Sequence, residues 1–302
     1  MVLFRSSGIA AQPLRRITQP VAVYGVGVTS KASSGSLHDR LIVRPGAKVR
    51  IADLDPGDTH GYEKDTAPAK TAKDVERLAA LQERLWAEGR RRVLLVLQGM
   101  DASGKDGTIK HVMTGFHPLG CRVVGWGVPS AVELAHDYLW RIHQAVPGNG
   151  EIVIFNRSHF EDVLVVRVHD LVPRERWSRR YDQLNDFEAT LAAEGTTILK
   201  FFLHISPEEQ LERFKERYDD PTKRWKFKVG DLEERKLWKD YMAAYEDVLA
   251  RCSTDVAPWF VIPSDRKWFR NLAIADIVAD ALDDLDPQYP ARDDLPKDLV
   301  IT

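Results

Sequence analysis

This chain of 302 residues has only two cysteines, no hydrophobic run long enough to span a membrane and no strong net charge. Its two cysteines, Cys121 and Cys252, are too few and too far apart for a disulfide framework or a metal knuckle, which favours the reducing cytoplasm. The apolar run at 93–97 is far shorter than the ~18 residues of a membrane span, so we expect no membrane partner. A formal charge of -2 excludes a globally basic protein, and we expect no nucleic-acid partner; any polyanion must bind a local basic patch.

The first 38 residues lack acidic side chains, because they contain neither Asp nor Glu. Their Ser, Gly, Ala and Arg content resembles that of an organelle transit peptide, but no clear amphipathic period is present. We therefore interpret residues 1–38 as a disordered extension outside the fold. Residues 39–286 are predicted to form the folded domain, and residues 287–302 a tail that wraps over its surface.

Apolar strands alternate with amphipathic helices along the domain. A helix from 73 to 89 leads into the strand "RVLLVLQ", and a loop, a helix through "KDGTIKHVM" and the strand "CRVVGWG" complete a βαβ unit. Ser130 and Glu133 form a capping box that predicts a helix through Trp140. Further strands are expected at "EIVIF", "TTILKFFLHI" and "WFVI", with helices at 173–195, 206 onward, 231–251 and 266–285. This order predicts an α/β fold whose parallel sheet is covered on both faces, in three layers.

The loop "LQGMDASGKDGT" carries the chemistry. Gly99, Gly104 and Lys105 have the G-x-x-x-x-G-K spacing of a P-loop, but Asp106 replaces the usual Ser or Thr that holds magnesium. A glycine-rich turn between a buried strand and a helix directs backbone N–H groups at phosphate oxygens. We therefore predict a phosphate or nucleotide site that also includes Ala102, Ser103 and Gly107.

Carboxylates inside a phosphate loop need a divalent cation between them and the phosphate. Asp101 is the first predicted ligand of Mg²⁺, with Mn²⁺ as a second option, whereas Asp106 either binds the cation or caps the helix. The strand "EIVIF" ends in Asn156 where P-loop enzymes usually have Asp, and Glu161 is a candidate for the second carboxylate. Arg157 follows at the carboxyl end of the strand, where open α/β sheets bind their ligands.

Basic residues gather in a second segment, beyond the fourth predicted strand. Arg213 and Arg217 lie four residues apart, on one face of a helix. The run "TKRWKFKVG" and the start of the last helix add further cations: Lys223, Arg224, Lys226, Lys228, Arg266 and Lys267. Such a run is either a solvated face or a clamp for a polyanion. Trp225 and Phe227 in the same run either stack on a base or anchor the segment.

The stretches "LQGMDASGKDGTIKHV", "PSAVELAHDYLWRIH", "IFNRSHFEDVLVVRVH" and "DDPTKRWKFKVGDLEERKLW" together resemble the polyphosphate kinase 2 family, from about residue 40 to the end of the domain. The resemblance implies a thymidylate-kinase-like P-loop fold with a helical lid at about 213–235. It implies reversible, magnesium-dependent phosphoryl transfer between inorganic polyphosphate and a nucleotide, by a homo-oligomer that takes adenine or guanine nucleotides. The resemblance implies that the catalytic residues are Lys105, Asp101, Arg157 and Arg217.

The residues after the third predicted strand bear on the acceptor. One branch of the family has Asp-Arg-Ser-Trp-Tyr here, whereas this chain has "NRSHF" from Asn156 to Phe160. In this segment the chain resembles the branch that uses both AMP and ADP. Two other functions stay open on the residues alone: an ATP-dependent nucleoside or nucleotide kinase, and a P-loop module that only senses nucleotide.

Overall fold

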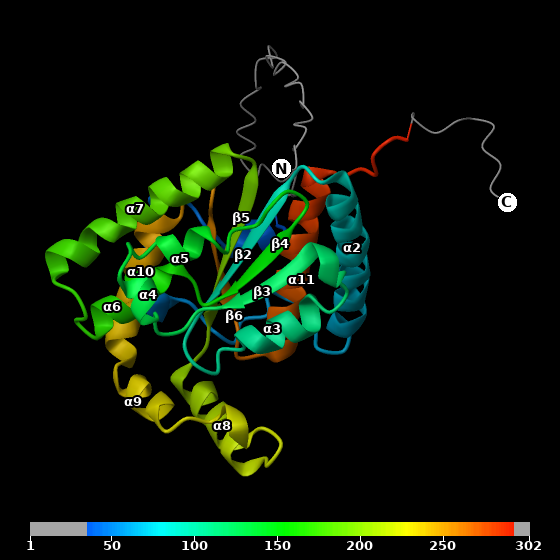
Figure 1. The fold of residues 1–302 in the computed structure, drawn as a ribbon. Helices are drawn as coiled ribbons and strands as arrows, with labels where there is room; N and C mark the ends of the chain where they lie inside the picture. The colour runs from blue at the N-terminus through cyan, green and yellow to red at the C-terminus, as the bar shows by residue number, and fades with distance from the viewer. Residues whose placement is uncertain (1–34, 293–302) are drawn as a thin grey trace, which may run out of the picture.

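A six-stranded sheet forms the centre of the computed structural model, which describes residues 35–292 (Figure 1). The strand order is β1-β6-β5-β2-β4-β3. The strands are β1 (Ile42–Val43), β2 (Arg92–Gln98), β3 (Cys121–Gly125), β4 (Ile152–Asn156), β5 (Thr196–His204) and β6 (Trp259–Pro263). All neighbours pair in parallel except β1, which joins β6 in antiparallel register.

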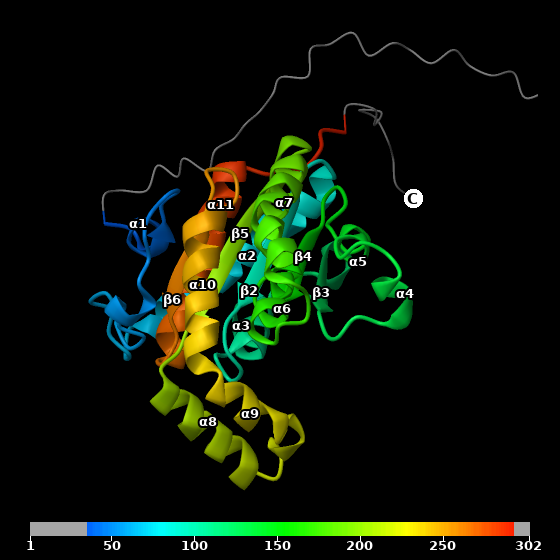
Figure 2. The same ribbon diagram turned by 90° about the vertical axis from the view of Figure 1, so that its left-hand side faces the viewer.

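Helices cover both faces of this sheet and make three layers (Figures 1 and 2). One face carries α2 (Ala67–Glu88), α3 (Lys105–Val112) and α11 (Lys267–Leu285). The other carries α7 (Arg174–Ala193) and α10 (Trp238–Cys252). The shorter helices are α1 (Leu37–Leu41), α4 (Ala131–Leu134), α5 (Trp140–His143), α6 (Val165–Val168), α8 (Pro207–Asp219) and α9 (Gly230–Lys236).

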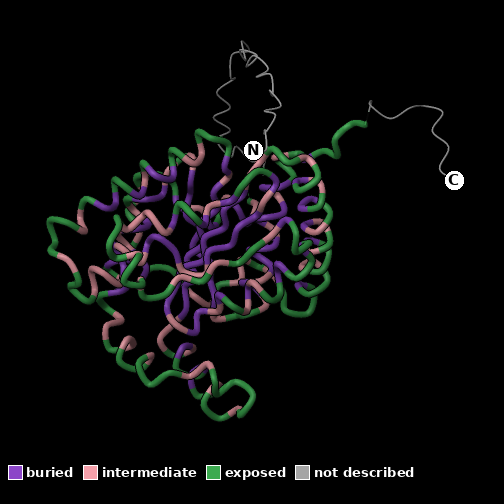
Figure 3. The backbone as a smooth tube through the Cα atoms, viewed as in Figure 1, coloured by how far each residue is buried: buried purple, intermediate pink, exposed green. Residues whose placement is uncertain are grey.

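The hydrophobic core lies on both faces of the sheet, because helices cover both faces. Residues 93–97 of β2 alternate between the two hydrophobic clusters, and none of them is exposed to solvent. A strand buried on both faces has no polar face, which explains its continuous apolar sequence. Figure 3 shows the buried segments concentrated in the sheet, with exposed chain at the periphery.

Several element predictions need correction at their ends. The Ser130–Glu133 capping box is present, but the predicted helix through Trp140 is two short helices, because Asp137 accepts a hydrogen bond from the Leu139 N–H and forms a turn between them. The helix predicted at 231–251 likewise breaks at Leu237, between α9 and α10. The antiparallel strand β1 was not predicted.

The domain also begins earlier than residue 39. Ser36 caps α1, and Leu37 is buried against the core. The remainder of the predicted extension, residues 1–34, and residues 293–302 of the predicted tail lie outside the described range. Between residues 35 and 292, no helix has both the length and the apolar character needed to cross a membrane.

The carboxyl ends of the parallel strands meet at one edge of the sheet. Leu97 of β2 is in register with Asn156 of β4, and Gln98 with Phe202 of β5. From this edge the chain after β5 projects as a helical hairpin, residues 207–236, which contains α8 and α9 (Figures 1 and 2). The hairpin and the loop after β2 therefore face the same region of space.

Candidate active site

The loop after β2, residues 99–104, has the backbone that a phosphate cradle requires. Gly99 has φ +149°, and a Cβ there would lie 2.7 Å from the carbonyl oxygen of Leu203. Ala102 also adopts a positive φ, 62°, which is uncommon for a residue with a side chain. The Ser103 hydroxyl is buried and has no hydrogen-bond partner in the described part of the chain. The loop thus directs polar groups inward at the start of α3, whose N-terminal end favours anions.

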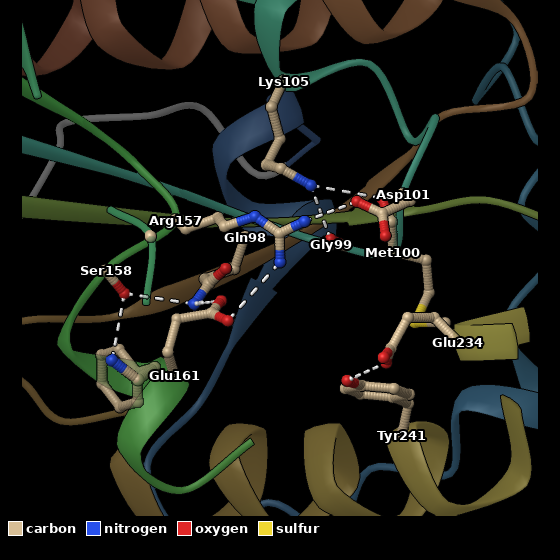
Figure 4. Close-up of polar contacts among 12 residues, drawn as sticks. Gln98, Gly99, Met100, Asp101, Lys105, Arg157, Ser158, Glu161, Glu234 and Tyr241 are labelled. Atoms are coloured by element: carbon tan, nitrogen blue, oxygen red, sulfur yellow. Dashed lines mark hydrogen bonds and ion pairs between the residues drawn. The ribbon is translucent and has the colours of Figure 1, made fainter. Parts of the chain in front are cut away.

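Lys105, the first residue of α3, lies almost fully inside this loop. Its Nζ donates to the carbonyl oxygens of Gly99 at 2.7 Å and Met100 at 3.2 Å (Figure 4). Burial, and secondarily the charge of Arg157, lower the pKa of Lys105 to about 8. A phosphate group in the loop would offer this ammonium a stronger partner than two neutral carbonyls.

Arg157 connects the loop to the end of β4. Its guanidinium lies between two carboxylates, with Nη2 2.5 Å from Asp101 Oδ1 and Nη1 3.5 Å from Glu161 Oε2 (Figure 4). Burial opposes its charge, but Glu161 and Asp101 outweigh that cost and raise the pKa of Arg157. Gln98 donates to the other oxygen of Glu161 at 3.0 Å. Both oxygens of Glu161 are therefore engaged within the protein, whereas Asp101 also borders the cavity described below.

Asp106 occupies the first turn of α3 and contacts the hairpin. Asn156 donates to its Oδ1 at 2.9 Å, and Lys226 lies 3.5 Å from its Oδ2. Burial alone would raise the pKa of Asp106, but the hydrogen bond from Asn156 and the charge of Lys226 lower it. Besides the two predicted roles, binding of the cation and capping of the helix, Asp106 thus contacts a hairpin lysine.

A cavity of about 900 Å³ lies between the loop, the ends of the strands, the start of α11 and the hairpin. Most predicted site residues line it: Asp101, Ala102, Gly104, Lys105, Asp106, Gly107, Asn156, Arg157, Arg213, Arg217, Lys223, Lys226, Lys228 and Lys267. Five predicted residues are outside its lining: Gly99, Ser103, Glu161, Arg224 and Arg266. The structure thus brings the two predicted clusters, loop and basic segment, around one space.

The cations of the hairpin and of the start of α11 divide into those that form an ion pair and those that do not. Lys223 pairs with Asp220 at 2.8 Å, and Lys267 of α11 pairs with Glu216 at 3.1 Å. No ion pair of Arg217 or Lys228 occurs within residues 35–292, although both border the cavity. Cations at this surface can exchange weak protein partners for phosphate oxygens.

Of the two aromatic residues in the hairpin turn, one packs against the protein and the other is exposed. Phe227 packs on the rings of Phe214 and Tyr218, which anchors the turn. Trp225 is 77% exposed and borders the cavity, with Lys226 over its ring. The anchoring interpretation therefore fits Phe227, and Trp225 remains accessible to a ligand.

Arg213 requires a correction, because it is buried and fully used within the protein. Its five N–H groups all donate, to the carboxylate of Glu209 and to the carbonyl oxygens of Ala102, Ser103, Ser264 and Asp265. No donor remains for polyphosphate, so Arg213 supports the loop instead. Its spacing four residues after Glu209 was the sequence signal for an internal partner.

Two other predicted cations also point to protein partners. Arg266 donates to the carbonyl oxygen of Gly57 and Arg224 to that of Tyr218. Conversely, the cavity is lined by residues that the sequence analysis did not select, among them Trp126 and Arg270. Arg270 lies one helical turn after Arg266, a spacing that pointed to the site only once the start of α11 was placed beside the loop.

Comparison with known proteins gives a consistent result. The family model described as polyphosphate kinase 2 (PPK2) matches residues 61–290. An AMP/ADP-polyphosphate phosphotransferase of Meiothermus ruber is 52% identical over 261 residues, which cover 86% of this chain and 98% of that protein. An ADP-polyphosphate phosphotransferase of Rhodopseudomonas palustris is 46% identical over 72% of this chain and 79% of its own length.

A solved structure agrees with these sequence matches. The crystal structure of polyphosphate kinase 2 from Arthrobacter aurescens TC1 has a TM-score of 0.82 to this chain and is 42% identical to it. The match covers 85% of this chain and 93% of that one. The similarity therefore extends through nearly the whole described fold.

Proposed function

Because the chain belongs to the polyphosphate kinase 2 family, we propose that it transfers a phosphoryl group, reversibly, between inorganic polyphosphate and AMP or ADP. The two relatives named above act on these substrates by name, and the first is similar over almost its full length. The single observation that carries the proposal is the cavity in which the phosphate loop faces the hairpin lysines. Membership of the family agrees with the resemblance seen in the sequence and with the observed α/β fold.

Three cations are placed to act on the transferred group. Lys105 lies in the loop, Arg157 at the end of β4 and Arg217 on the hairpin, so they approach the cavity from different elements. Phosphoryl transfer demands little proton chemistry and depends on positioning and on charge that matches the phosphoryl oxygens. We assign these three side chains to that task, with Asn156 beside them.

A divalent cation fits one carboxylate of the site better than the other. Mg²⁺ takes one or two carboxylates and completes its shell with phosphate oxygens and water. It therefore needs no cluster of protein ligands, and residues 35–292 contain no group of three or more His, Cys, Asp or Glu side chains that could hold a metal ion. Asp101 borders the cavity, whereas Glu161 is occupied by Gln98 and Arg157. We propose that Asp101 holds Mg²⁺ or Mn²⁺ and that Glu161 positions Arg157. When bound, the cation would supply positive charge that offsets the charge of the phosphate oxygens.

The donor is where the alternatives differ. An ATP-dependent kinase needs positive charge for one triphosphate, whereas a polymer needs a longer tract. Lys223, Lys226 and Lys228 add the positive charge of the hairpin turn to that of the loop in the cavity lining. This additional charge favours polyphosphate. A module that only senses nucleotide would have no use for the same tract.

The experiment is a turnover assay with separated products. The protein is incubated with Mg²⁺, polyphosphate and AMP, ADP or GDP in turn, and with ATP and AMP in place of polyphosphate. We expect ADP and ATP to form from the adenine acceptors at the expense of polyphosphate, and the Lys105→Ala variant to serve as the inactive control. Transfer from ATP alone, or no turnover with any pair, would reject the proposal.

We also expect the chain to assemble with copies of itself. The edge strand β3 leaves Val123 half-exposed, and Val128 just beyond it is 96% exposed. Apolar side chains at a sheet edge are commonly covered in an assembly. Sedimentation equilibrium of the purified protein would measure the oligomeric state.

A further inference from the structure

Arg270 of α11 lies against the phosphate loop and the start of α3. It is 3% exposed and borders the cavity. A Cβ added to Gly104 would lie 1.7 Å from its Nη1, and one added to Gly107 would lie 3.0 Å from its Nη2. The guanidinium therefore fills the space that these two glycines leave, at the N-terminal end of α3.

The charge of Arg270 has no acidic partner within residues 35–292. Nε and Nη2 both donate to the neutral Oδ1 of Asn271, at 3.2 and 2.8 Å, and Nη1 reaches the Ser103 carbonyl oxygen only at 3.4 Å. Burial, and then the nearby charge of Arg213, lower the pKa of Arg270 to about 9. A buried cation without a counter-charge is costly, which calls for a function that explains its retention.

Two other buried arginines show what a structural role looks like here. Arg180 pairs with Asp162 at 2.8 Å. Arg213 has all five donors engaged, as described above. Arg270 differs from both, because one N–H on each of its terminal nitrogens has no acceptor among the described residues.

We propose that Arg270 is a phosphate-binding residue, a second fixed cation of the loop, whose missing counter-charge is a phosphate group of the substrate. Lys105 and Arg270 would then approach that group from the loop interior and from α11. The inference rests on the proposed function, since it requires a phosphate substrate in this cavity. The phosphate belongs either to the polyphosphate or to the nucleotide, and the chemistry of recognition is the same for both.

The test compares Arg270→Met, which removes the charge at similar length, with Arg270→Lys, which keeps it, and with Arg77→Met as the control. Arg77 pairs with Asp280 of α11, and neither residue is part of the cavity lining. Dissociation constants for inorganic tripolyphosphate, AMP and ADP are measured by calorimetry with Mg²⁺ at fixed salt, together with the melting temperature without ligand. We expect Arg270→Met to weaken tripolyphosphate or nucleotide binding about ten-fold or more, the value of a lost charged hydrogen bond.

The melting temperature separates this role from a structural one. Loss of an uncompensated cation should leave the melting temperature unchanged or raised, whereas Arg77→Met should lower it and leave all three dissociation constants unchanged. Arg270→Lys should bind more tightly than Arg270→Met. The ligand whose binding weakens identifies the source of the phosphate.

Two results would overturn the inference. One is equal dissociation constants for the parent and Arg270→Met, and the other is weaker binding that accompanies a fall in melting temperature and is not improved in Arg270→Lys. If Arg270→Met does not fold, Arg270→Gln takes its place as the neutral variant. A parent that neither binds tripolyphosphate nor turns it over would instead reject the proposed function itself.

Discussion

The phosphate loop and the hairpin both present cations to one cavity, but they hold them differently. In the loop region Lys105 is 8% exposed and bonded to backbone carbonyls, and Arg157 is fixed between Asp101 and Glu161. In the hairpin Lys223 is 54% exposed and paired only with a neighbouring acid. Charges act strongly in a buried, preorganised site and weakly at a solvated surface, where salt screens them. We therefore expect the loop to govern the rate of transfer and the hairpin to govern affinity for the polymer.

The largest effect should come from the loop lysine. Lys105→Met removes a buried charge that faces the transferred group, so we expect kcat to fall by about 10²-fold or more. Turnover of polyphosphate and ADP measures it. An unchanged kcat would remove the loop from the mechanism.

The same variant should not be less stable, which distinguishes a functional loss from unfolding. Burial lowers the pKa of Lys105 to about 8, so the folded protein disfavours the charged form that the unfolded chain carries at neutral pH. Removing the amine should therefore leave the unfolding temperature at pH 7 unchanged or raise it. A lower unfolding temperature would attribute part of the lost activity to misfolding.

Asp101→Asn should have the next largest effect. It removes a charged partner of Arg157 and the carboxylate that we assign to the cation, which we expect to lower kcat/KM about 10- to 100-fold. Excess Mg²⁺ should restore part of the activity if metal affinity is what was lost. Glu212→Gln, which breaks an exposed ion pair of the hairpin outside the cavity lining, is the matched control and should change kcat/KM little. Loss of activity that no Mg²⁺ concentration relieves would assign Asp101 to loop structure.

The pH dependence should report the buried lysine. Because the pKa of Lys105 is lowered to about 8, the protein is charged at this position below pH 8 and loses the charge above it. We expect kcat/KM to decline above pH 8, by up to about ten-fold per pH unit. The effect on stability has the opposite direction: the free energy of unfolding should rise from pH 8 toward 10.5, because the cost of burying the Lys105 charge disappears. A value of kcat/KM that stays constant from pH 7 to 9 would contradict a lowered pKa of Lys105.

Much of the fold was predictable because its signals are local. The strands "RVLLVLQ" and "EIVIF" are continuous apolar runs, and a sheet covered on both faces requires such runs. The strand β1 has only two residues and is formed by its pairing with β6, so no run of its own indicates it. The breaks at Asp137 and Leu237 occur inside patterns that favour helix, and only the surrounding contacts reveal them.

The site was predictable where neighbouring strands end together, and not where helices pack on it. Gly99 and Lys105 follow β2 and Asn156 ends β4, and the carboxyl ends of these parallel strands must meet at one edge. Arg213 and Arg217 share a helix and both border the cavity, yet protein acceptors take every N–H of Arg213, whereas Arg217 makes no ion pair within the described residues. That difference depends on where α8 lies against the loop, a long-range contact that periodicity does not encode.

The smallest effect, and the sharpest test of the comparison, should come from two hairpin lysines. Lys226 and Lys228 border the cavity from a solvated turn. Polyphosphate carries about one negative charge per phosphate and releases counterions on binding, as nucleic acid does. Neutralising both lysines with Lys226→Gln and Lys228→Gln should raise the KM for long polyphosphate several-fold, about the value of two exposed ion contacts, and leave the nucleotide KM and kcat nearly unchanged.

The salt dependence of that KM decides whether the lysines contact the polymer. Two lost phosphate contacts should reduce the slope of log KM against log salt by about 1.4, at roughly 0.7 per contact with a single strand. Lys215→Gln with Lys236→Gln is the matched control, because these lysines pair with Glu212 and Glu233 on the hairpin surface and lie outside the cavity lining. It removes the same charge from the same hairpin and should leave the slope almost as in the parent. Equal slopes for the two double variants, whether both are reduced or both unchanged, would mean that Lys226 and Lys228 make no specific contact with the polymer, and the contrast between a catalytic loop and a polymer-binding hairpin would fail.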